Sequence, residues 1–338
     1  MTSISELKEL LSSPKKIVIT THQRPDGDAI GSSLGLYHYL KLKKHDVTVI
    51  TPNDYPEFLK WLPGDEYVMN YEKQTLQAQQ LVTEANIIFC LDFNKLYRLE
   101  ELGKFIELSA SVKVLIDHHL DPDDFAEFIF SNIKACSTCE LVYAFILEMD
   151  DKSLITKDIA SCLYTGILTD TDRFRIPTTS AYVHRVSAEL LEYGIDHTKI
   201  YEEVYETFSE NRLRFFGYCI REKLKIIPAF KTGIISLETA DLRKFNIQSG
   251  DTEGLVNYPL WIKDIQLSVL IIQRPGEVRL SFRSKGDFSV NDLARNNFEG
   301  GGHRNAAGGK SQLSVAQTQE KLIAILAAFK NDLNKLSE

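Results

Sequence analysis

Acidic and imidazole side chains recur in this sequence at points where apolar runs end. They fall within the segment 21–32, at position 92, in the triplet 117–119 and at position 170. One carboxylate at the end of a strand is common, but several acids brought together are costly to bury unless cations neutralise them. The pattern therefore indicates a metal site, whose candidate ligands are His22, Asp26, Asp28, Asp92, His118 and Asp170.

The first of these segments reads His22-Gln-Arg-Pro-Asp26-Gly27-Asp28 and directly follows the β-branched run 16–20. A helix should begin near Ala29 or Ile30, so three potential ligands lie in one strand-to-helix loop, with Gly27 allowing the turn between two carboxylates. An acidic helix cap would account for Asp28 alone. It would leave His22 and Asp26 unexplained, so we interpret the loop as part of a site.

Carboxylates and imidazoles without thiolates suit manganese, magnesium, iron or zinc, and a shared aspartate suits a pair of such ions. Two divalent ions about 3.5–4 Å apart activate water and stabilise both the attacking and the leaving oxygen of an in-line displacement at phosphorus. The set thus predicts phosphoester hydrolysis without a serine, cysteine or lysine nucleophile.

A second group of residues follows late in the chain, in the segment Asn297–Gly309. Its three successive glycines, 300–302, let backbone N–H groups approach an anion, and His303 and Arg283 could supply charge or directed donors. This pattern favours a phosphate or nucleotide grip, although a plain glycine-rich loop would have the same composition. The polar segment Asp251–Asn257 is equally compatible with a surface hairpin.

The elements that must position the first group alternate in type. Short β-branched runs at 16–20, 46–50, 86–91 and 113–116 are separated or followed by helical patterns at 29–43, 138–149, 155–168 and 181–193. That alternation predicts an α/β fold with a mostly parallel, doubly wound sheet covered on both faces. Ligands of such sheets bind at the carboxyl ends of the strands, where the candidate residues lie.

The second half of the chain changes character. A charged helical stretch at 201–221 precedes strand-like runs at 232–237, 265–273 and 278–283 and a closing helix at 315–333. We predict a catalytic domain at 1–190, a helical linker at 191–213 and a smaller α+β domain at 214–338, with the active site in the cleft between the two domains.

Composition sets the remaining limits. The 338 residues are 43% hydrophobic and 25% charged, and the formal charge of −8 argues against binding long duplex nucleic acid. No signal-peptide or bilayer-length apolar stretch is present, so we expect a cytoplasmic protein without a membrane span. The five cysteines should be reduced, and the lone Cys136-Ser-Thr-Cys139 motif is better explained as a helix cap than as a zinc site.

Taken in order, these motifs resemble the DHH phosphoesterase family, named for the Asp-His-His found here at 117–119. The similarity extends from the loop at 22–32, through Asp92 and the triplet, to Thr165-Gly-Ile-x-x-Asp170-Thr. The Gly300-Gly-Gly-His303 segment, followed by Ala306-Ala-Gly308, is similar to the DHH-associated C-terminal domain. Compact length and the segments 253–257 and 281–284 look most like the NrnA-type branch, which combines oligoribonuclease and adenosine 3′,5′-bisphosphate (PAP) phosphatase activities.

The resemblance implies a role for each residue. His22, Asp26 and Asp92 would hold one manganese ion, and Asp28, Asp92, His118 and Asp170 would hold the other, so that Asp92 is the bridge. His119 would contact the scissile phosphate, and Asp117 would support a neighbouring imidazole or water. The C-terminal domain would bind one end of the substrate through the following residues: Asn257, Ser281, Arg283, Gly301, Gly302 and His303.

The implied substrates are short RNA oligonucleotides, linear dinucleotides and nucleotide bisphosphates. Activity on cyclic di-AMP, activity on polyphosphate and non-catalytic nucleotide binding are the alternatives, and the first two would use the same metal centre. The resemblance favours Mn²⁺, although magnesium and other divalent ions suit the same ligands. A homodimer is compatible with the sequence, but no pattern specifies one.

Overall fold

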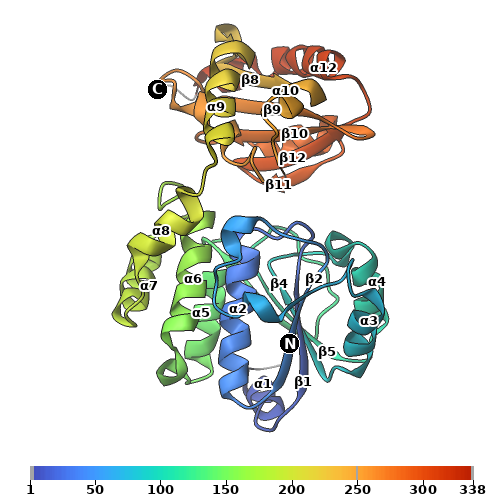
Figure 1. Ribbon diagram of the computed structural model, residues 1–338, viewed down its shortest axis with the longest axis vertical. Coiled ribbons are helices and arrows are strands. Elements are labelled where there is room, and N and C mark those ends of the chain that lie inside the picture. The colour runs from blue at the N-terminus through green and yellow to red at the C-terminus, as the bar shows by residue number, and fades with distance from the viewer. Residues whose placement is uncertain (1–3, 249, 336–338) are drawn as a thin grey trace. The chain divides into compact units, whose positions relative to one another are not determined.

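The computed structural model describes residues 4–248 and 250–335, which form two compact units (Figure 1). Unit 1 comprises Met1–Thr207 and unit 2 comprises Phe208–Glu338. The division falls inside the segment 191–213, where the sequence predicts a linker. The predicted domain limits and the cleft between the domains stay predictions.

Unit 1 is built on a six-stranded parallel sheet with the order β3-β2-β1-β4-β5-β6. Its strands are β1 (Lys16–Thr21), β2 (Asp46–Thr51), β3 (Val68–Asn70), β4 (Ile87–Leu91), β5 (Val112–Asp117) and β6 (Phe128–Ser131). The strand order reverses between β1 and β4. Such a switch point opens a crevice at the carboxyl ends of the two strands, which is where ligands bind in sheets of this kind.

Helices cover both faces of this sheet, with α2, α5 and α6 on one side and α3 and α4 on the other (Figure 1). The helices of unit 1 are α1 (Ile4–Leu10), α2 (Gly27–Leu42), α3 (Thr75–Glu84), α4 (Glu101–Leu108), α5 (Thr138–Glu148), α6 (Lys157–Asp170), α7 (Ala181–Glu192) and α8 (His197–Tyr205). Alternate residues of β1 enter different cores: Ile17 and Ile19 pack with α2, whereas Val18 packs with α3 and α4. Burial on both faces explains why the strands are continuous apolar runs.

Glycines bring helices α2 and α6 into close contact. A Cβ atom on Gly31 would lie 2.5 Å from the backbone oxygen of Cys162, and one on Gly166 would lie 2.9 Å from Oδ1 of Asp28. Only residues without a side chain fit at these distances. The contact fixes the first turn of α2, which carries Asp28, against α6, which ends at Asp170.

Unit 2 contains a mixed six-stranded sheet with the order β11-β12-β10-β9-β8-β7, in which only β8 and β9 pair in parallel. Its strands are β7 (Leu224–Ile227), β8 (Thr232–Leu237), β9 (Leu267–Arg274), β10 (Glu277–Ser284), β11 (Gly301–His303) and β12 (Ala306–Ser311). Its helices are α9 (Glu210–Tyr218), α10 (Thr239–Lys244), α11 (Val290–Asn297), α12 (Val315–Ala328) and α13 (Lys330–Lys335). The two units confirm the predicted fold class.

Several predicted elements differ in detail. The helical stretch expected at 201–221 is two helices, because Ser209 begins α9 by accepting a hydrogen bond from the Arg212 amide. The segment around Gly301 forms the short strands β11 and β12 rather than a plain loop. Within residues 4–248 and 250–335, no helix combines the length and apolar character needed to span a bilayer. All five cysteines are buried and free, as expected.

Candidate metal centre

Most of the predicted ligands of unit 1 gather at the carboxyl ends of β1, β4 and β5. Asp92 directly follows β4, Asp117 ends β5, and His22 directly follows β1. Three clusters with metal-ligand spacing result among these residues: His22, Asp26 and Asp92; Asp28, Asp92 and His118; and Asp92, Asp117 and His119. Asp92 belongs to all three clusters.

The two oxygens of Asp92 face different clusters. Oδ2 lies 3.3 Å from Nε2 of His22, whereas Oδ1 lies 3.5 Å from Nε2 of His118. The residue is 2% exposed and adopts a left-handed backbone conformation with φ 63°. Strain of this kind concentrates at functional sites, and here it turns the carboxylate between the two imidazoles.

The imidazoles of His22 and His118 are oriented by backbone carbonyls. Nδ1 of His22 lies 2.8 Å from the carbonyl oxygen of Gln23, and Nδ1 of His118 lies 3.3 Å from that of Ala135. A carbonyl only accepts, so Nδ1 carries the proton in each ring. Both rings thus present Nε2 to the carboxylates, which is the arrangement that metal-binding histidines adopt.

Asp26 and Asp28 have separate structural roles. Asp26 begins helix α2, where its Oδ1 accepts the amides of Asp28 and Ala29 at 3.1 Å each, and its Oδ2 lies 3.9 Å from Nε2 of His22. The helix cap is therefore Asp26 and not Asp28, contrary to the cap considered from the sequence. Asp28 lies in the first turn, 1% exposed.

The carboxylate of Asp28 is held by the first turn of α5. Its Oδ2 accepts the amide of Thr138 at 2.6 Å, and its Oδ1 accepts the amide of Cys139 at 2.8 Å. Nε2 of His118 lies 3.8 Å from Asp28 Oδ2 and 3.5 Å from Asp170 Oδ2. Helix α6 thus brings Asp170 to the same imidazole as Asp28 and Asp92.

Burial and the repulsion between acidic side chains both shift the pKa values in this cluster. Burial, together with the charges of Asp92 and Asp170, raises the pKa of Asp28 well above its usual range. Burial and neighbouring acids likewise raise the pKa of Asp170 to about 7. Burial also opposes ionisation of Asp92, but when Nε2 of His118 and of His22 is protonated as well, hydrogen bonds from these rings outweigh burial and hold the pKa of Asp92 well below normal.

These residues fit a pair of divalent cations. Ligand atoms about 2.0–2.2 Å from one ion are roughly 3–3.5 Å from each other, and the closest nitrogen-oxygen pairs here are 3.3 and 3.5 Å. Carboxylate oxygens suit manganese and magnesium, and imidazole nitrogens suit iron and zinc, so the mixed set of donors fits divalent cations of this range. Cations would also neutralise acids that otherwise raise each other's pKa.

His119 is tied to the neighbouring acid of the triplet. Its Nδ1 lies 2.7 Å from Oδ1 of Asp117, and its backbone amide donates to Asp117 Oδ2 at 3.2 Å. Asp117 is fully buried. The carboxylate accepts the Nδ1 proton and so fixes the orientation of the His119 ring.

The strand register of unit 2 aligns most of the predicted substrate residues. Arg283 pairs with Ala306, which pairs with His303, and in the next row of the same face Ser281 pairs with Gly308, which pairs with Gly301. Residues directly opposite each other in a sheet share a face. The predicted substrate residues Ser281, Arg283, Gly301 and His303 therefore lie on one face of the sheet of unit 2. The intervening Phe282 is fully buried on the other face.

Gly302 and Asn257 lie outside these rows. Gly302 has φ 152°, and its amide donates to Asn291 Oδ1 at 2.9 Å. Its N–H is therefore already engaged with a side chain of unit 2. Asn257 lies on the short 3-10 helix Leu255–Trp261, and its amide donates to the carbonyl oxygen of Gly254 at 2.9 Å.

Two residues of these networks escaped the sequence analysis. Thr138 donates from Oγ1 to Asp92 Oδ1 at 3.0 Å, and Asn291 accepts the Gly302 amide. Both stand at the start of a helix, beside the caps Ser137 and Ser289. The sequence pattern at these positions, Ser-Thr or Ser-x-Asn at the start of a helix, predicts that the serine caps the helix. It does not predict that Thr138 or Asn291 bonds to a residue far away in the sequence.

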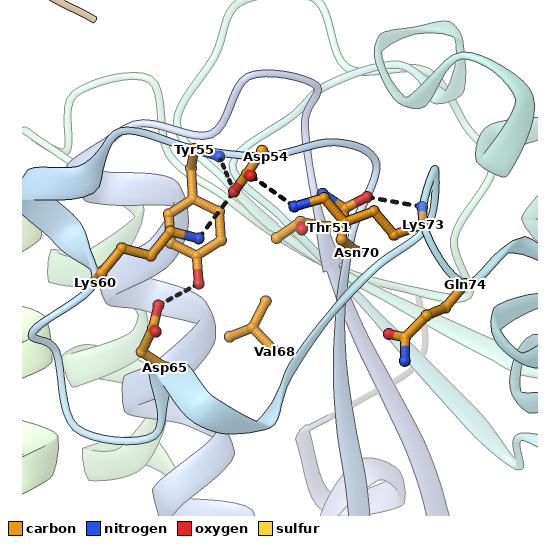
Figure 2. A pocket seen from close by; sticks show the side chains of 9 residues that line it. All are labelled: Thr51, Asp54, Tyr55, Lys60, Asp65, Val68, Asn70, Lys73 and Gln74. Carbon is orange, nitrogen blue, oxygen red and sulfur yellow. Dashed lines mark hydrogen bonds and ion pairs between the residues drawn. The ribbon is translucent and has the colours of Figure 1, made fainter. Parts of the chain in front are cut away.

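A separate pocket of about 390 Å³ is lined by residues of β2, of β3 and of the loops next to these strands (Figure 2). None of the predicted site residues lines it. Its lining residues are Thr51, Asp54, Tyr55, Lys60, Asp65, Val68, Asn70, Lys73 and Gln74. Lys60 and Lys73 both contact Asp54 at 2.9 Å, and the Tyr55 hydroxyl donates to Asp65 at 2.5 Å. These charged groups are paired with each other, so the pocket lacks the converging acids of the metal centre.

Comparison with known proteins identifies the two domains of the chain. Residues 16–167 match the model of the DHH family, N-terminal domain, and residues 233–335 match that of the DHHA1 domain. An exopolyphosphatase-related protein from Bacteroides fragilis is 40% identical, with a TM-score of 0.95 and coverage of 98% of this chain and 97% of that one.

Several relatives carry functional names. The bifunctional oligoribonuclease and PAP phosphatase NrnA of Thermus thermophilus is 31% identical, with 99% of this chain and 95% of the relative covered. The probable NrnA of Streptococcus mutans is 27% identical, with 95% and 97% covered. The chain therefore belongs to the DHH family of phosphoesterases and is a hydrolase with a DHH domain followed by a DHHA1 domain.

Proposed function

We propose that this protein hydrolyses phosphoester bonds in short oligoribonucleotides, including linear dinucleotides, and in adenosine 3′,5′-bisphosphate, using two divalent cations of which Mn²⁺ is the best match. The observation that carries the proposal is the position of Asp92. One oxygen faces the imidazole of His22 and the other faces that of His118. A carboxylate with this placement suits a ligand shared by two ions.

The two cations, when bound, supply charge that activates water and stabilises the displaced oxygen. His22, Asp26 and Asp92 would hold one ion, and Asp28, Asp92, His118 and Asp170 would hold the other. His119, whose Nδ1–H donates to Asp117, would contact a non-bridging oxygen of the scissile phosphate through Nε2, and it can donate there only as an imidazolium with both nitrogens protonated. A donor fixed in this way needs no reorganisation as negative charge builds up on phosphorus oxygens.

The substrate class comes from unit 2 and from the named relatives. Arg283 and His303 lie in one row of the sheet, with Ser281 and Gly301 in the next row of the same face. A guanidinium beside an imidazole and a hydroxyl suits a terminal phosphate or a nucleoside end. Relatives that match nearly the whole chain are named for oligoribonuclease and PAP phosphatase activity, which fits a short substrate with such an end.

A substrate panel tests the proposal. The purified protein with Mn²⁺ receives diadenylate, diguanylate, adenosine 3′,5′-bisphosphate, cyclic di-AMP and polyphosphate, each at several concentrations. We expect the highest kcat/KM for the linear dinucleotides or the bisphosphate. Preferential release of orthophosphate from polyphosphate would instead favour an exopolyphosphatase, a possibility raised by the name of the 40% identical structure.

A variant pair tests the metal centre. Asp92→Ala removes the shared carboxylate and should abolish metal-dependent release of mononucleotide. Asp123→Ala is the matched control, since this acid forms an ion pair with Lys95 and its side chain is 53% exposed. Retained turnover in Asp92→Ala would contradict the two-cation proposal.

A further inference from the structure

We propose that Thr138 is a positioning residue that locks the bridging carboxylate of Asp92 to the carboxylate of Asp28. This inference rests on the proposed function. Thr138 touches both acids: Oγ1 donates to Asp92 Oδ1 at 3.0 Å, and the backbone amide donates to Asp28 Oδ2 at 2.6 Å. Thr138 is fully buried, so no water competes for either hydrogen bond.

The hydroxyl acts on the oxygen of Asp92 that faces His118. That oxygen lies 3.5 Å from His118 Nε2 and 3.7 Å from His119 Nδ1, whereas the other oxygen faces His22. A hydroxyl has one proton to donate, and here the acceptor is an ionisable oxygen of the bridge. The hydrogen bond therefore restricts rotation of the Asp92 carboxylate about its last side-chain bond.

The backbone of Thr138 is itself held in place. Ser137 begins α5 by accepting the amide of Glu140, and the side chain of Glu140 accepts the amide of Cys136 at 2.6 Å. This reciprocal pairing at the helix start fixes the amides of Thr138 and Cys139, both of which point at Asp28. The two amides therefore hold both oxygens of the Asp28 carboxylate in fixed positions.

One short segment thus fixes the relative position of two acids that are 64 residues apart in the sequence, at positions 28 and 92. The segment is Cys136-Ser-Thr-Cys139, and its two thiols are not required for this role. A metal site whose ligands are positioned in advance loses less conformational entropy on binding. Removing such an outer hydrogen bond from a ligand typically weakens metal affinity by about ten- to hundredfold.

The experiment measures Mn²⁺ affinity by calorimetric titration of the full, metal-stripped chain, without substrate. Thr138→Val removes the hydroxyl but retains the branched shape and the amide, and Thr138→Ser retains the hydroxyl. Thr318→Val is the matched control, because this fully buried threonine also donates from a helix, to Ser311 Oγ at 2.9 Å in unit 2. Circular dichroism checks that each variant is folded.

We expect Thr138→Val to weaken Mn²⁺ binding by about ten- to hundredfold and Thr138→Ser to restore most of it. Thr318→Val should bind as the wild type does. Wild-type affinity in Thr138→Val would overturn the inference while leaving the proposed function intact. If Thr138→Val does not fold, equal affinities of Thr138→Ala and Thr138→Ser would overturn it instead. Wild-type protein that binds no divalent ion would overturn the proposed function as well.

Discussion

The imidazole of His119 is fixed by Asp117, whose Oδ1 lies 2.7 Å from Nδ1 of the ring. Because the carboxylate only accepts, Nδ1 must carry a proton, and the ring points Nε2 away from Asp117. The acid is fully buried, so the orientation of the ring does not depend on solvent.

Asp117→Asn should therefore lower kcat by about ten- to hundredfold with a smaller effect on KM, since an amide holds the ring less firmly and can offer it a donor instead. Steady-state kinetics with diadenylate measures the change. Asp123→Asn, which alters an acid half-exposed at the surface, should leave kcat unchanged. A wild-type kcat in Asp117→Asn would contradict the positioning of His119 by this acid.

Arg283→Ala should mainly raise KM for a substrate with a terminal phosphate. The guanidinium of Arg283 shares a row with His303, and its removal takes away ground-state binding without altering the metal ligands. Arg279→Ala is the control on the same strand, because Arg279 is occupied by Glu277 at 2.6 Å. Equal KM values for the two variants would exclude Arg283 from substrate binding.

Mn²⁺ should stabilise unit 1 against unfolding. A ligand that binds only the native state at one hundred times its Kd adds about 2.7 kcal/mol to the free energy of unfolding. Thermal unfolding with Mn²⁺ and with EDTA measures the effect, which Asp92→Ala should remove. A stabilisation that persists in Asp92→Ala would locate the bound ion elsewhere.

Gly31→Ala should destabilise the protein by about 1–3 kcal/mol, since its Cβ would be 2.5 Å from the oxygen of Cys162 and the helices must separate. Gly217→Ala provides the opposite expectation. This glycine lies in helix α9 with no atom within 4 Å of an added Cβ, so alanine should stabilise that helix by about 0.5–1 kcal/mol. Denaturant unfolding compares the two, and a neutral Gly31→Ala would mean that α2 and α6 tolerate separation.

Asp54 should give a pH-dependent contribution to stability. Hydrogen bonds from Lys60 and Lys73 lower the pKa of Asp54 far below its usual range (Figure 2). The stabilisation is therefore present above the unfolded pKa of about 4 and is lost as pH falls toward the native value.

Asp54→Asn should accordingly lower the free energy of unfolding at pH 7, by less than about 1 kcal/mol because the site is partly exposed. The difference from wild type should shrink between pH 4 and pH 2 in denaturant titrations. A difference that is constant over this range would assign the effect of the substitution to something other than charge.

The sequence was most informative where chemistry and periodicity coincided. Asp92 could be recognised because it follows a fully apolar strand, and the first loop because it joins β1 to α2. The edge strands Val68–Asn70 and Phe128–Ser131 were missed, since strands of three or four residues carry too few positions for a pattern. Neighbouring strands, and not local propensity, recruit these segments to the sheet.

The contacts that orient the side chains of the site could not be predicted from the sequence either. Thr138 meets Asp92 across 46 residues of sequence, and the rings of His22 and His118 are held by backbone carbonyls that no side-chain pattern reveals. The Gly302 amide was expected to face substrate, and its bond to Asn291 depends on where α11 packs. Ligand identity can be inferred from residue types, whereas orientation depends on the tertiary fold.

Position 92 needs both a left-handed backbone conformation and a short side chain with a carboxylate, and aspartate is the amino acid that meets both requirements. Asparagine and glycine adopt φ near 63° readily but offer no carboxylate. Glutamate supplies the charge, but it enters the left-handed region less easily and places its oxygens one bond further out. Selection for activity from a saturation library at position 92 should therefore recover aspartate alone.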